Sequence, residues 1–150
     1  MKNYLRFAAM IITSTTFMYF LMYLNIYELN HFAFGETRLY MALIMGSAMA
    51  VIMLTYMLKM YTNKRINMGI YAFSIVLFAV SLFLVRSQMT IDDVSYMKSM
   101  IPHHSIAILT SERANIRDPR VRALANEIIE TQIEEIAEME RLIRELENDR

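Results

Sequence analysis

The chain has 150 residues, none of which is cysteine, and only three are glycine. Without cysteine, no disulfide can report the compartment, and cysteine-based catalysis is excluded. A glycine-rich phosphate-binding loop is not apparent either. Charge is scarce at one end: residues 1–85 carry eight charged side chains, and the other twenty-two lie in residues 86–150. The net charge of zero therefore describes neither half of the chain.

Long hydrophobic runs fill the half that lacks charge. Three of them cover about residues 5–26, 39–60 and 68–85. A helix needs roughly 20 apolar residues to cross ~30 Å of hydrocarbon, and soluble helices of this length seldom lack charge. The first run is too long for a cleaved signal peptide. We therefore expect three transmembrane helices in a first domain, residues 1–87.

The basic residues of the flanking loops predict the orientation. Lys2 and Arg6 precede the first run, and Lys59, Lys64 and Arg65 lie between the second and the third. Short loops rich in lysine and arginine stay in the cytoplasm. The N-terminus is thus expected inside, and three crossings place the C-terminal domain outside the cytoplasm. The sequence predicts a multi-pass protein of the cytoplasmic membrane, with the lipid bilayer as a partner.

Small residues recur at every fourth position of the second run. Ala42, Gly46 and Ala50 share one helix face, which lets a neighbouring helix approach closely. The same interval separates five methionines: Met41, Met45, Met49, Met53 and Met57. A thioether path for a soft cation is one interpretation. We favour gap-filling at a helix interface, because an ionisable residue usually marks a transport path.

The pattern changes in residues 88–150, which form a second domain. Thr90 is a candidate N-cap for a helix over about 91–115, and Pro102 should kink that helix. An Asp-Pro pair then starts another helix over about 119–147, with proline at its first position. The sequence therefore predicts a soluble segment of two helices.

Two faces of the last helix compete for the core. One is a heptad seam: Val121, Ala125, Ile128, Gln132, Glu135, Met139, Leu142 and Leu146. Burial of its central polar residues, Gln132 and Glu135, would cost free energy unless hydrogen-bond partners replaced the lost water. The other face lies about 100° round the helix, and it consists of Ile129, Ile133, Ile136 and Ile143. From this helix alone both alternatives stay open.

The preceding helix carries a group of soft metal ligands. Met97, Met100 and His104 share one face at helical spacing, whereas His103 points about 100° away unless the proline bend redirects it. Thioether sulfur suits copper(I), and imidazole suits copper, zinc, iron and nickel. We interpret the group as a candidate site for a soft metal ion such as copper(I).

The spacing of these residues resembles a known family. The residues that carry the likeness are Met100-Ile101-Pro102-His103-His104, Ala107-Ile108, Gln132, Glu135-Ile136 and Met139. They resemble the bacterial domain-of-unknown-function family 305 over about residues 90–146, outside the hydrophobic runs. One position departs from the family: Thr110 stands where methionine is usual.

The resemblance implies a ferritin-like helical bundle on the periplasmic side of the inner membrane. It also implies copper binding linked to copper tolerance in some members. By position, Met100, His103, His104 and Met139 match the family's candidate ligands, and Gln132 and Glu135 lie beside them, placed to orient an imidazole.

Two helices make only half of a four-helix bundle. We therefore expect an all-α protein whose ferritin-like half-bundle is completed by homo-oligomerisation, as a dimer or larger assembly. The predicted function is a membrane-anchored, extracytoplasmic copper(I)-binding protein involved in copper handling or tolerance. The alternative is a structural or signalling membrane protein whose tail only mediates oligomerisation, without metal.

Two other classes are not expected. A ferritin-like di-iron enzyme needs Glu-x-x-His pairs, and the sequence contains none, so we do not expect an enzyme. Nucleic acid is not an expected partner, because residues 86–150 carry thirteen acidic side chains against nine basic ones.

Overall fold

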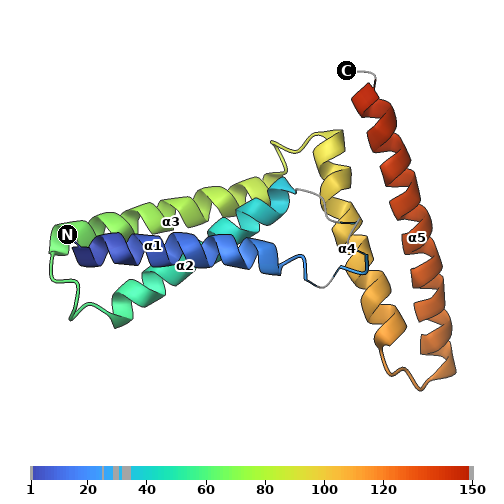
Figure 1. Ribbon diagram of the computed structural model, residues 1–150, viewed down its shortest axis with the longest axis horizontal. Coiled ribbons are helices and arrows are strands. Elements are labelled where there is room, and N and C mark those ends of the chain that lie inside the picture. The colour runs from blue at the N-terminus through green and yellow to red at the C-terminus, as the bar shows by residue number, and fades with distance from the viewer. Residues whose placement is uncertain (1, 25, 29–30, 32–34, 149–150) are drawn as a thin grey trace. The chain divides into compact units, whose positions relative to one another are not determined.

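The computed structural model is all-α (Figure 1). It describes residues 2–24, 26–28, 31 and 35–148, and within them it has five helices. These are α1 (Lys2–Leu21), α2 (Glu36–Tyr56), α3 (Lys64–Ser87), α4 (Asp93–Arg113) and α5 (Pro119–Asn148). The chain divides into two compact units. The first contains residues 1–22 and 37–90, and the second contains residues 23–36 and 91–150.

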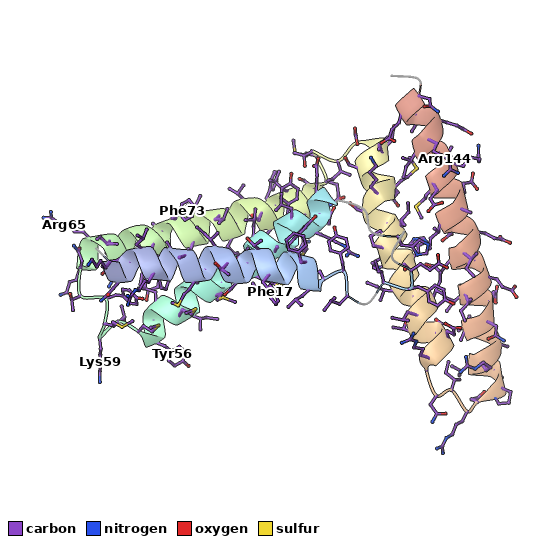
Figure 2. All side chains as sticks on the ribbon, viewed as in Figure 1. Phe17, Tyr56, Lys59, Arg65, Phe73 and Arg144 are labelled. Atoms are coloured by element: carbon purple, nitrogen blue, oxygen red, sulfur yellow. The ribbon has the colours of Figure 1, made fainter. Side chains whose placement is uncertain are left out.

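Helices α1, α2 and α3 of the first unit are each long and apolar enough to span a membrane. The shortest has 20 residues, which gives a length of about 30 Å. Large apolar side chains such as Phe17 are exposed on the outside of this unit, as a surface in contact with lipid requires (Figure 2). The fold thus has the helices of a multi-pass membrane protein.

Helix α1 ends at Leu21, although the hydrophobic run continues to residue 26. The chain turns at residues 22–24, where Nη1 of Arg38 donates a hydrogen bond of 2.9 Å to the carbonyl of Met22. The last carbonyls of a helix need such partners. Hydropathy alone does not register this turn, because the residues beyond it are also apolar.

Helices α1 and α2 approach closely at Gly46. A Cβ atom built on Gly46 would clash with the side chain of Thr15. Ala42 and Ala50, one turn to either side, are buried as well. Small side chains on this face of α2 therefore set the separation of the two helices.

A polar network joins the ends of the three helices near residue 63. Asn63 caps α3, and its backbone N–H donates to the hydroxyl of Tyr4 at 3.1 Å. Tyr4 in turn donates to Oδ1 of Asn67 at 2.9 Å, and Asn67 donates to the carbonyl of Tyr61 at 2.7 Å. The network fixes the basic connection between α2 and α3 against the start of α1.

The second unit contains the α4–α5 hairpin. Asp92, rather than Thr90, caps α4: its Oδ1 accepts from the N–H of Ser95 at 2.8 Å. The helix continues through Pro102 without ending. Asp118 starts α5 in the same way, accepting from the N–H of Arg120 at 2.8 Å. Both starts are made by a side chain that accepts from an unpaired N–H of the first turn.

The core between α4 and α5 uses parts of both predicted faces of α5. It contains Val94, Met97, Ile101, Ile108, Ile136 and Ile143, with Ile129, Met139 and Leu142 packed against them. Ile133, from the all-isoleucine face, is 52 % exposed, and Val121, from the other face, is 48 % exposed. The contact stripe lies between the two seams, so neither predicted face is the core by itself.

Candidate metal centre

A polar group lies in the middle of the hairpin. Nδ1 of His104 on α4 is 3.0 Å from Oε2 of Glu135 on α5. Gln132 donates to the same carboxylate oxygen at 3.2 Å. The Nδ1 atom is buried, and in the described part of the chain it has no well-aligned hydrogen bond, so its contact with Glu135 is chiefly electrostatic. The hairpin thus brings together His104, Glu135 and Gln132.

Burial is the main influence on the protonation of His104. It lowers the pKa of His104 from the ordinary value of 6.5, the negative charge of Glu135 opposes this, and His103 adds to the lowering. The ring is therefore neutral at neutral pH. With Nδ1 facing a carboxylate, its proton is assigned to Nδ1 and the lone pair to Nε2. Nε2 has no hydrogen-bond partner among the described residues.

The three candidate thioethers lie on both helices of the hairpin. Met97 of α4 is buried in the core, and Met139 of α5 packs against the same core. Met100 is partly buried, and it lies one helical turn before His104. Sulfur from both helices is thus present in the core of the hairpin that also carries His104.

His103 stands apart from this group. Its side chain is exposed, and its ring centroid is 6.2 Å from that of His104. The hydroxyl of Thr110 donates to the carbonyl of Ile106 at 3.0 Å, so it bonds within its own helix. Among the described residues, no three histidine, aspartate or glutamate side chains are grouped to hold a metal ion. A metal bound here would depend on methionine sulfur.

Sequence reasoning missed a third histidine beside α4. The hydroxyl of Ser105, which is fully buried, accepts from the N–H of Tyr27 at 2.6 Å and lies 2.9 Å from Nδ1 of His31. A Cβ on Gly35 would lie 2.9 Å from the hydroxyl of Ser99. Tyr27, His31 and Gly35, from the described part of the connection between α1 and α2, therefore lie against α4. The composition of this connection could have indicated the contact, because residues 23–36 are rich in aromatic and aliphatic side chains.

Comparison with known proteins places the hairpin in a family. The model of the domain of unknown function DUF305 matches residues 93–150. An uncharacterized protein of Acanthamoeba polyphaga mimivirus is 33 % identical over 135 residues, which cover 84 % of this chain and 87 % of that protein. This coverage is too large to leave out α2 and α3, so the likeness extends into the apolar helices. No solved structure matches. The chain belongs to the DUF305 family, and its DUF305 domain is the α4–α5 hairpin.

Proposed function

We propose that the α4–α5 hairpin binds a soft metal ion, copper(I), and that the protein is a membrane-anchored copper-handling protein. The observation that carries the proposal is the position of His104: its Nδ1 faces Glu135 in the same hairpin whose core contains Met97 and Met139. A carboxylate on one ring nitrogen fixes the orientation of the ring and strengthens the other nitrogen as a ligand.

The donor atoms fit copper(I) better than a harder ion. His104 would bind through Nε2, and Met100 and Met139 would bind through sulfur, with Met97 available from the core. Soft thioether ligands favour copper(I), whereas carboxylate clusters favour harder ions. His103 would approach only from the exposed side of α4. Glu135 and Gln132 would not touch the metal, because Glu135 faces the other ring nitrogen of His104 and Gln132 donates to Glu135.

The proposed place of action is the extracytoplasmic side of the membrane. The basic residues next to the apolar helices support this orientation. A site there would bind copper before it enters the cytoplasm, which is a role in copper tolerance. A reporter enzyme that works only outside the cytoplasm should be active when fused after the last residue, and inactivity would reverse the orientation.

A second candidate function is oligomerisation without metal. Val121, Leu124 and Ile128 form an exposed apolar stripe on α5. A second copy could cover this stripe and complete a four-helix bundle. In that case His104 and Glu135 would only join the two helices of the hairpin.

Copper(I) titration separates the two functions. Metal-free, full-length protein without a histidine tag is titrated in mild detergent under reducing conditions, against a competing chelator. We expect one tight site per chain. Replacing His104 by alanine should weaken it most, and Glu135→Gln should cost roughly 10- to 100-fold in affinity, as the loss of a ligand-orienting group does. Met89→Leu is the matched control, because Met89 is 74 % exposed and outside the hairpin.

Two results would contradict copper binding. One is equal copper(I) affinity in the wild-type protein and the His104→Ala variant. The other is an equal loss of affinity in the Met89→Leu control, since the effect would then not depend on the hairpin. If, after either result, the variant and the wild-type protein still form oligomers of the same size, oligomerisation remains as the function.

A further inference from the structure

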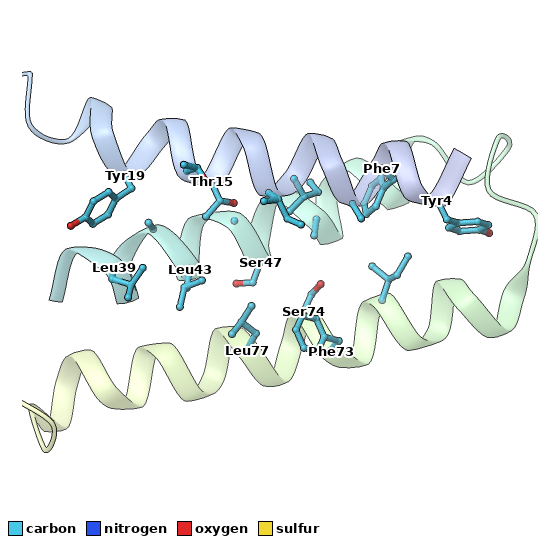
Figure 3. Close-up of a pocket in the computed structure, with 18 of the residues that line it drawn as sticks. Tyr4, Phe7, Thr15, Tyr19, Leu39, Leu43, Ser47, Phe73, Ser74 and Leu77 are labelled. Carbon is cyan, nitrogen blue, oxygen red and sulfur yellow. The ribbon is translucent and has the colours of Figure 1, made fainter. Parts of the chain in front are cut away.

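A groove of about 910 Å³ lies between the three apolar helices (Figure 3). Its lining from α2 is mostly buried, and includes Ala42, Gly46 and Ser47. Its lining from α1 and α3 includes Ile12 and Phe73, which are largely exposed. Helix α2 is therefore the floor of the groove, and α1 and α3 are its walls. The volume is at the upper end of the roughly 300–1,000 Å³ of small-molecule sites.

The groove is long and opens toward the surroundings of the helices. On α1 its lining extends from Tyr4 to Phe20, a distance of about 24 Å at 1.5 Å per residue. This is most of the ~30 Å thickness of a bilayer's hydrocarbon core. The exposed walls mean that the groove is continuous with whatever surrounds the apolar helices, which in a membrane is hydrocarbon.

We propose that one acyl chain of a membrane phospholipid occupies this groove. Water is a poor occupant, because a buried water needs two to four polar partners and the lining is mainly apolar. An empty groove would forfeit dispersion contacts along its whole length. A helix from a second copy has a diameter of about 10–12 Å and is stiff. A flexible hydrocarbon chain is far thinner and adapts to the walls.

Two polar groups of the lining are paired within the protein and are therefore compatible with a hydrocarbon chain. Ser47, which points into the groove in Figure 3, donates its hydroxyl to the carbonyl of Ile44 at 2.8 Å. Tyr4 donates to Asn67 and does not need a partner inside the groove. Hydroxyl groups that are paired within the protein carry no penalty against an apolar ligand.

The charge at one end of the groove selects a phospholipid among lipids. The lining of α3 begins at Ile66, directly after the exposed residues Lys64 and Arg65. These side chains can pair with the phosphate of a headgroup while its acyl chain lies along the groove. Arginine binds phosphate through two parallel hydrogen bonds, and lysine binds it as a point charge.

The two glycines of the groove provide a specific test. A Cβ on Gly46 would clash with Thr15, whereas a Cβ on Gly69 meets nothing within 4 Å. Gly69→Leu should therefore fill the groove without disturbing the contact between α1 and α2. Ala79→Leu adds bulk to an exposed position of the same helix outside the groove, and it is the matched control.

Full-length protein is stripped of lipid, incubated with phosphatidylglycerol vesicles and returned to mild detergent. Native mass spectrometry then measures the mass of the protein with any lipid that it retains. We expect one retained phospholipid per chain in the wild type and in Ala79→Leu, at least a tenfold loss in Gly69→Leu, and an intermediate value in Gly69→Ala. The intermediate variant distinguishes a filled groove from a misfolded protein.

Equal lipid retention in the wild type and Gly69→Leu would overturn the proposal. So would a wild-type dimer that retains no lipid and dissociates in Gly69→Leu, because the groove would then hold a helix of the second copy.

Discussion

Two opposing effects act on the pKa of His104. Burial favours the neutral ring, and Glu135 at 3.0 Å favours the charged one. Burial is the larger effect, so the folded protein binds a proton on this ring less readily than the unfolded chain does. A metal ion also requires the deprotonated nitrogen, so the same burial reduces competition between proton and metal.

We predict that the metal-free protein loses stability as the pH falls below about 6.5. The pKa of His104 is lowered in the folded state, so its contribution is complete above the unfolded value of 6.5 and is lost as the pH falls through the folded value. The melting temperature in detergent, measured from about pH 7.5 to about pH 5, should fall less steeply in His104→Gln.

The carboxyl group of Asp118, whose pKa is also lowered, does not interfere with this measurement. Arg120 holds the pKa of Asp118 below its ordinary 3.8, so Asp118 titrates at lower pH. Parallel curves for the wild type and His104→Gln would show that His104 is not the group responsible.

At the scale of the helix, α5 shows what periodicity can and cannot predict. Its length and its start at an Asp-Pro pair were readable from the sequence, because caps and apolar spacing are local properties. The buried face was not, because α5 carries apolar residues around more than half of its circumference. Contact with α4 selects Ile136 and leaves Ile133 exposed, and that choice depends on the partner helix.

Replacing Ile136 by alanine should lower the free energy of unfolding by about 2–5 kcal/mol, because it opens a cavity in the hairpin core. Ile133→Ala should change it by only about 0.5 kcal/mol, since this side chain is on the surface. Denaturant unfolding followed by circular dichroism measures both. The opposite ranking would mean that the all-isoleucine seam faces α4.

The candidate metal site was also predicted only in part, because its local features follow from the sequence and its contacts between helices do not. The Met-Ile-Pro-His-His motif places candidate ligand atoms on one helix, and helical geometry separates the faces of His103 and His104. The sequence alone could not show that Glu135 faces His104 across the hairpin, since that contact requires the register of α4 against α5. Nor could it show that His31 contacts Ser105, which is 74 positions away in the chain.

At the scale of the molecule, the hairpin leaves apolar surface without a cover. Val121, Leu124 and Ile128 follow one another along α5 at helical spacing, and Leu124 is 56 % exposed. Two hairpins that share such stripes would form the four-helix arrangement that a single chain lacks. Residues on the other side of α5, such as the exposed Asn126, would stay in solvent.

We predict that Leu124→Glu reduces the assembly to a monomer in mild detergent, because a buried charge without a partner opposes association. Asn126→Glu adds the same charge on the far side of the helix, and this control should leave the size unchanged. Light scattering coupled to size-exclusion chromatography gives both masses. A wild-type monomer, or an unchanged mass in Leu124→Glu, would remove this stripe as an interface.

The fully buried hydroxyl of Ser105 has a consequence for where the family domain begins. It contacts Tyr27 and His31, which are separated from it in the sequence by α2 and α3. The folded body is therefore discontinuous in sequence, and the boundary of the family match at residue 93 cuts through it. An excised fragment beginning there would contain every candidate ligand but would uncover Ser105 and the face of α4 around it.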